Sequence, residues 1–101
     1  MDFDNLFEDM IAAMKSKIGE SGAKAGTYLK QVMGKNKETI KELTEYYLNG
    51  DLTEAEYKEE MKDNMTTLEN ELLNLKIMKK KTIENVVNAG IDVLMNSIRI
   101  L

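Results

Sequence analysis

Proline is absent from the 101 residues of this chain, and only 6 residues are glycine. These two residue types are the strongest helix breakers, so the backbone can run in long uninterrupted helices. Good helix formers such as leucine, methionine, glutamate and lysine dominate the sequence. The sequence therefore predicts an all-α protein, and its length is enough for one domain, residues 1–101.

The clearest helix boundary lies at the midpoint of the chain. Asn49-Gly50 is a turn signal, and Gly50 lies where a helix C-cap favours a residue with positive φ. Thr53 and Glu56 have the spacing of a capping box, in which each side chain binds the other residue's backbone amide. The pattern predicts a helix over about residues 3–48, a turn at 49–52 and a second helix over about 53–99.

Apolar residues recur at helical spacing through both halves of the chain. In the second half the stripe is interrupted at residues 79–82 and then resumes, with no breaker between, which predicts one helix roughly 70 Å long at about 1.5 Å per residue. In the first half, three glycines within residues 19–26 leave two alternatives. One is a continuous helix whose glycines share a face and allow close approach of a second helix, and the other is a loop or kink.

Two helices of equal length that fold back at the midpoint bring residue i close to residue 101 − i. Phe3 then lies near Ile98, and Phe7 lies near Leu94, so apolar residues face each other along the predicted antiparallel helical hairpin. Two helices leave half of each stripe exposed. We therefore expect self-association, most simply as a dimer, to complete a four-helix bundle with coiled-coil-like packing.

The charge pattern suggests how two copies could be oriented. Residues 51–71 carry a net charge of −6, and residues 72–101 carry +3. Two copies that cross antiparallel near residues 69–70 would bring these opposite charges together, which selects orientation and register. The alternative is that both segments are solvated faces. Residues 79–81 are three consecutive lysines beside an acidic helix, and this arrangement favours a solvated surface over an anion-binding site.

Both ends of the chain are rich in apolar residues that a two-helix end cannot bury, and exposed apolar patches usually mark interfaces. The alternative is a fuller bundle in which the same residues form the core. The candidate interface residues are Phe3, Phe7, Met10, Met14, Gly22, Gly26, Leu68, Leu72, Ile91, Leu94, Met95 and Ile98.

Residues 48–62 carry a local family resemblance. Leu48, the run Gly50-Asp51-Leu52-Thr53 and the pair Glu56-Tyr57 resemble the helix-start motif of the short C-terminal domain family, SHOCT. The resemblance covers about 15 residues of the chain, and a long helix follows the motif here, whereas in the family the motif lies at the chain end. It implies a role in oligomerisation or accessory interaction, without catalysis.

The sequence offers no catalytic residues, no cofactor-binding motif and no metal site. Histidine and cysteine are absent, which removes the commonest general base, the thiolate nucleophile and the usual transition-metal ligands. Residues 49–56 resemble the second half of an EF-hand calcium loop, but Tyr47 stands where an oxygen ligand is needed, so we expect no calcium. The net charge of −4 argues against nucleic acid as a partner.

We therefore expect a non-enzymatic structural or interaction protein. It would be a small, cytoplasmic, self-associating helical adaptor or assembly factor, such as a microbial or phage accessory protein, with a protein partner at its apolar ends or in a helix groove. The alternative is a peripheral protein that inserts its apolar helix ends at a membrane surface.

Overall fold

The computed structural model of the chain describes residues 2–19, 22–76 and 78–100, and the side chains of all of these except 22, 23 and 100. Four α-helices account for most of these residues: α1 (Phe3–Ser16), α2 (Gly22–Leu48), α3 (Glu54–Asn74) and α4 (Lys80–Ile100). The described residues contain no strand. The all-α prediction is confirmed, but each of the two long helices that we expected is divided in two.

The midpoint turn between α2 and α3 has the predicted chemistry. Gly50 has φ +85°, and the amides of Gly50 and Asp51 donate to the carbonyls of Tyr47 (3.1 Å) and Tyr46 (2.8 Å). This pair of bonds is the Schellman motif, which satisfies carbonyls at a helix end. The Thr53 hydroxyl accepts from the Glu56 amide at 3.1 Å, and the Glu56 carboxylate accepts from the Thr53 amide at 2.9 Å. The predicted turn and capping box are therefore confirmed.

The first break separates α1 from α2 and corresponds to the alternative of a loop or kink, which the glycines of residues 19–26 left open. The side chain of Asp2 caps the start of α1 by accepting from the amides of Asp4 and Asn5. The helix ends at Ser16, and Gly19 has φ +66°, a left-handed conformation that glycine adopts without steric cost. The break is narrower than the predicted segment, because α2 begins at Gly22. The single helix over 3–48 was therefore wrong.

The second break is a correction to the predicted helix over 53–99. α3 ends at Asn74, α4 begins at Lys80, and Lys76 between them has φ +55°. A non-glycine residue pays about 1–2 kcal/mol for this conformation. Folding back offsets that cost, because α4 then buries residues such as Ile83 and Leu94 in the same chain, at about 1.5–3 kcal/mol for each fully buried aliphatic side chain.

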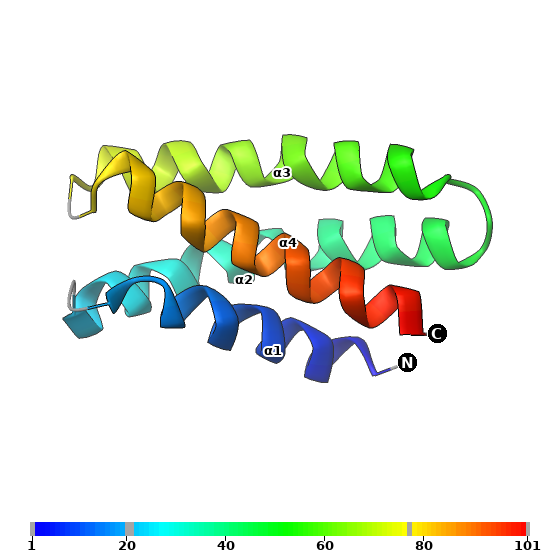
Figure 1. Cartoon of the computed structure of the whole chain (residues 1–101), viewed down its shortest axis with the longest axis horizontal. Coiled ribbons are helices and arrows are strands. Elements are labelled where there is room, and N and C mark those ends of the chain that lie inside the picture. Colours follow the sequence, from blue (N-terminus) through cyan, green and yellow to red (C-terminus); the bar gives the residue numbers. More distant parts are fainter. Residues whose placement is uncertain (1, 20–21, 77, 101) are drawn as a thin grey trace.

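The four helices pack side by side, with successive helices running in opposite directions (Figure 1). α1 contacts α4 and α2, while α3 contacts α2 and α4, so all four enclose one apolar core. The Cα atoms extend over 39 × 22 × 20 Å, well short of the expected length of about 70 Å. Methionine fills much of the core; its buried methionines are Met10, Met14, Met33, Met61, Met65 and Met95.

Candidate functional site

The predicted interface residues lie mainly inside this core. Nine of them are no more than 5 % exposed: Phe7, Met10, Met14, Leu68, Leu72, Ile91, Leu94, Met95 and Ile98. Phe3 is half-buried, and Gly26 is half-buried beside the aliphatic part of the Lys15 side chain. Gly22 begins α2, but its surroundings lie outside the described part of the chain. These buried residues cannot contact a partner while the helices stay packed. Their positions match the alternative in which the same residues form the core of a fuller bundle.

Among the described residues, the large apolar side chains that are exposed lie elsewhere, on the last turn of α2. Tyr46 is 50 % exposed and Leu48 is 45 % exposed. Neither residue was among the candidate interface residues, because both lie beside the apolar stripe that runs through Tyr47. Their position beside the stripe was the sequence signal for their exposure, because a large apolar residue off the stripe of an amphipathic helix faces solvent.

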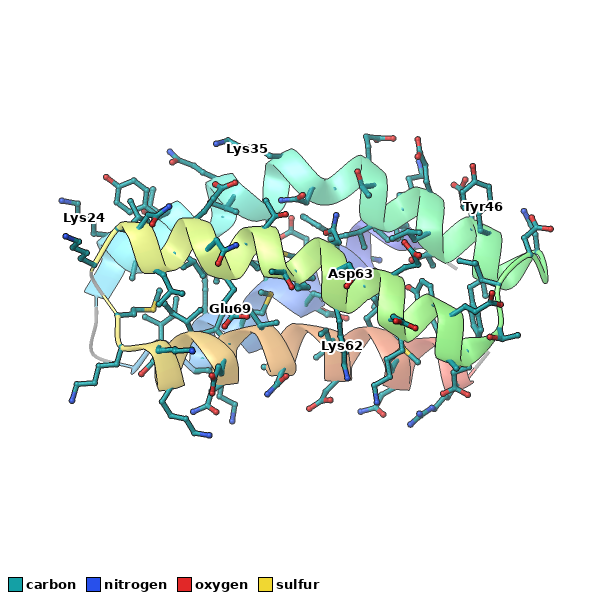
Figure 2. The ribbon with its side chains drawn as sticks, turned by 90° about the horizontal axis from the view of Figure 1, so that it is seen from above. Lys24, Lys35, Tyr46, Lys62, Asp63 and Glu69 are labelled. Carbon is teal, nitrogen blue, oxygen red and sulfur yellow. The ribbon has the colours of Figure 1, made fainter. Side chains whose placement is uncertain are left out.

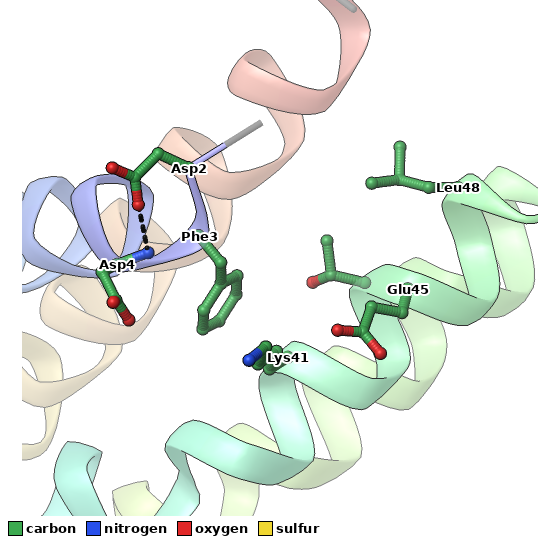
Figure 3. Close-up of a pocket in the computed structure, with 7 residues that line it drawn as sticks. Asp2, Phe3, Asp4, Lys41, Glu45 and Leu48 are labelled. Atoms are coloured by element: carbon green, nitrogen blue, oxygen red, sulfur yellow. Dashed lines mark hydrogen bonds between the residues drawn. The ribbon is translucent and has the colours of Figure 1, made fainter.

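Leu48 borders a wedge-shaped pocket between the start of α1 and the C-terminal half of α2 (Figure 3). The pocket has a volume of about 310 Å³, close to the lower limit for ligand sites. Its lining residues are Asp2, Phe3, Asp4, Lys41, Thr44, Glu45 and Leu48. Two of the carboxylates already have partners, since Asp2 caps α1 and Asp4 pairs with Lys37 at 2.9 Å. Four of the seven lining residues are charged, unlike the mostly apolar lining of typical small-molecule sites.

A buried polar group joins α2 to α3 behind this pocket. The Thr44 hydroxyl donates to the Ile40 carbonyl at 2.8 Å, which leaves the Tyr57 hydroxyl to donate to Thr44 at 2.7 Å. The rings of Tyr47 and Tyr57 stack, with their centroids 4.9 Å apart. Burial raises the pKa of Tyr57 to about 12, although the hydrogen bond with Thr44 acts in the opposite direction. Tyr57 therefore stays protonated near neutral pH, and its hydroxyl positions two helices.

Charge is strongly polarised along the long axis of the molecule. The end of α1, the start of α2, the end of α3 and the start of α4 lie at the same end of the molecule, opposite the α2–α3 turn (Figure 1). We define the basic end as residues 15–24 and 74–84, which contain seven lysines and two glutamates, a net charge of +5. Because the whole chain carries −4, the remaining residues carry −9. Figure 2 shows Lys24 near the basic end and Tyr46 near the opposite end.

Most of the negative charge lies toward that opposite end. We define the acidic half as residues 2–9 and 38–63, which contain thirteen carboxylates and three lysines. Glu54 pairs with Arg99 at 2.7 Å, while most other carboxylates of α3 face solvent. An acidic half and a basic end on one elongated molecule can attract oppositely charged surfaces, including those of a second copy.

Two further features of the described residues bear on binding. No group of three or more carboxylates is gathered there in a way that could hold a metal ion. None of the helices in that part of the chain has the length and apolar character needed to cross a membrane.

Comparison with known proteins gives no match: no family model, curated protein or solved structure matches this chain. The resemblance of residues 48–62 to the short C-terminal domain family stays a prediction.

Proposed function

We propose that the protein is a non-enzymatic helical adaptor or assembly factor that self-associates as an antiparallel dimer, with the basic end of each copy beside the acidic half of the other. The polarised charge is the observation that carries this proposal: +5 at the basic end and −9 over the rest of the chain. Complementary charge patches bring partners together and fix their orientation. A cytoplasmic location is part of the proposal, in keeping with a chain that lacks cysteine.

The antiparallel arrangement follows from how the charges can be satisfied. Head-to-tail stacking would leave one acidic end and one basic end unpaired however many copies are added, and it would therefore build an open filament. A side-by-side antiparallel pair satisfies both ends of both copies and closes with two-fold symmetry, the commonest symmetry of soluble oligomers. The apolar core is closed within each chain, so charged surface side chains make the contact between copies.

A binding role suits the polar groups better than catalysis does. The buried hydroxyls of Thr44 and Tyr57 bind each other, and Tyr57 stays protonated near neutral pH. The pKa of Glu56 is lowered because its carboxylate accepts from the Thr53 amide, a capping role. A general acid or base needs a pKa near the working pH and a reachable substrate proton, and neither group offers this.

Sedimentation equilibrium of three proteins tests the proposal. The first is the wild type, and the second is the triple variant Lys24→Glu, Lys80→Glu and Lys81→Glu, which changes exposed lysines on the helices of the basic end. The third is a matched control, Lys41→Glu, Lys58→Glu and Lys62→Glu, which makes the same change in net charge within the acidic half.

We expect a wild-type dimer that weakens as salt increases from about 50 mM to about 500 mM, because salt screens exposed charges. The basic-end variant should be a monomer at concentrations where the wild type and the control are dimers. A monomeric wild type at low salt, or equal effects of the two variants, would contradict the proposal.

A further inference from the structure

Seven exposed lysines gather at one end of the molecule from segments that are far apart in the sequence. They are Lys15, Lys17, Lys24, Lys76, Lys79, Lys80 and Lys81. In Figure 1 the end of α1 and the start of α2 lie at this end of the molecule together with the end of α3 and the start of α4, and Figure 2 places Lys24 there as well. The fold thus combines two lysine groups that appear separate and sparse along the chain.

These lysines are exposed and can meet a partner. Within the described part of the chain, the ion pairs of lysine involve Lys35 and Lys37, and none involves the seven at this end. The starts of α2 and α4 and the ends of α1 and α3 all lie at the same end. Their helix dipoles oppose one another there, so the lysines dominate the local field.

Apolar side chains lie between the lysines of the second loop. Leu75 and Met78 are half-buried and pack against the edge of the core, next to Lys76 and Lys79 in sequence. Lysines interspersed with apolar residues are typical of surfaces that bind at a lipid headgroup layer, where the charges meet phosphates and the apolar groups reach the acyl boundary.

We propose that this end of the molecule binds the surface of an anionic lipid bilayer, with the long axis of the protein directed away from the membrane. A cluster of four to eight lysines is about the size that recognises anionic lipid. End-on binding also separates the carboxylates of the acidic half from the lipid, because the molecule is 39 Å long and its acidic half lies toward the opposite end. Exposed charges that lie farther apart than the Debye length, about 8 Å at physiological ionic strength, are largely screened from each other.

The geometry favours a bilayer over nucleic acid. A planar anionic surface can meet the whole tip of a molecule that measures 22 × 20 Å across its long axis, whereas a duplex is convex and would engage only the lysines under it. Nucleic-acid-binding surfaces also usually follow a basic stripe along a domain, and the sides of this molecule become acidic toward the other end. The monomer binds in this way, because in the antiparallel dimer the acidic half of the partner copy lies beside each basic end.

Co-sedimentation with vesicles tests the inference. Wild-type protein is mixed with vesicles of equal parts phosphatidylcholine and phosphatidylglycerol, with vesicles of phosphatidylcholine alone, and with duplex DNA at equal phosphate concentration. The test variant changes the loop lysines, Lys17→Glu, Lys76→Glu and Lys79→Glu. The control is Lys41→Glu, Lys58→Glu and Lys62→Glu, which has the same net charge as the test variant.

The wild type and the control should bind the anionic vesicles, and neither should bind phosphatidylcholine alone. The loop variant should bind anionic vesicles at least about a hundredfold more weakly, since each lysine near an anionic surface contributes several-fold to the affinity. Absence of wild-type binding, or equal binding by the loop variant, would overturn the inference. Binding to DNA that is as tight as binding to vesicles would overturn the assignment to a bilayer.

Discussion

Two glycines inside helices provide a matched test of the packing between α1 and α4. Gly34 lies in α2, where an added Cβ would meet nothing within 4 Å. Gly90 lies in α4, where an added Cβ would lie 2.7 Å from Met14 Sδ and 3.0 Å from Met14 Cγ. Both positions gain about 1 kcal/mol of helix propensity from alanine. The two variants therefore differ mainly in what the new methyl group meets.

We expect Gly34→Ala to raise the free energy of unfolding by about 1 kcal/mol, because its methyl group enters open space. Gly90→Ala should gain the same propensity but pay about 1–3 kcal/mol for overpacking against a fully buried Met14. Gly90→Ala should therefore be less stable than Gly34→Ala by about 1–3 kcal/mol, equivalent to a Tm difference of about 4–8 °C per kcal/mol in a domain of this size.

Urea unfolding followed by circular dichroism measures both variants, and a double-mutant cycle assigns the cause. Met14→Ala removes Sδ, Cγ and Cε, the atoms nearest to the new methyl group, so Gly90→Ala should be less costly in that background, with a coupling of about 0.5–3 kcal/mol. Equal stabilisation by the two alanines, or a coupling of zero, would refute the packing of Met14 against Gly90 and thereby the register of α1 on α4.

Two further predictions concern the second loop and the buried tyrosine. Lys76→Gly should raise the free energy of unfolding by up to about 1 kcal/mol, because glycine adopts φ +55° without strain. Asn74→Gly, in the last turn of α3, should instead lower that energy. Urea titration measures both variants, and a loss of stability in Lys76→Gly would contradict the left-handed conformation of residue 76. The unfolded chain releases the Tyr57 proton near pH 10 and the folded chain near pH 12, so the free energy of unfolding should fall by up to about 3 kcal/mol as pH rises through that window. Tyr57→Phe should lack this component of the fall, and identical pH profiles for the two proteins would argue against the burial of the hydroxyl.

Local sequence signals predicted the all-α class and the midpoint turn because local interactions determine them. The Asn49-Gly50 pair supplies the left-handed residue, and the Thr53 and Glu56 side chains satisfy amides only three residues away. The apolar stripe likewise identified most residues of the core, since helical periodicity decides which side chains share a face.

The break between α3 and α4 could not be predicted in the same way. Lys76 adopts a left-handed conformation without glycine or proline nearby, so propensity gives no warning. The break is favoured by tertiary burial of α4, which depends on all four helices being present. The interruption of the stripe at residues 79–82 was the one local indication, and it also fitted a continuous helix with a polar turn.

The candidate surfaces also depend on the fold more than on local sequence. The wedge beside Leu48 exists because α1 and α2 diverge, and no short segment encodes that angle. The sequence indicated the charge difference within residues 51–101. The full polarity requires the end of α1 and the start of α2 to lie at the same end of the molecule as the end of α3 and the start of α4, which follows only when the chain forms four helices.

Fluorescence energy transfer between copies tests the proposed antiparallel dimer most directly. The chain has no cysteine, so a single cysteine at exposed Asn74, near the basic end, or at exposed Asn49, in the opposite turn, gives a unique label. Mixing donor-labelled Asn74→Cys with acceptor-labelled Asn49→Cys should give strong transfer. Labels at Asn74 in both copies should give weak transfer, because antiparallel copies hold them apart along a molecule 39 Å long. Stronger transfer between the two Asn74 labels, or none in any mixture, would contradict the antiparallel dimer.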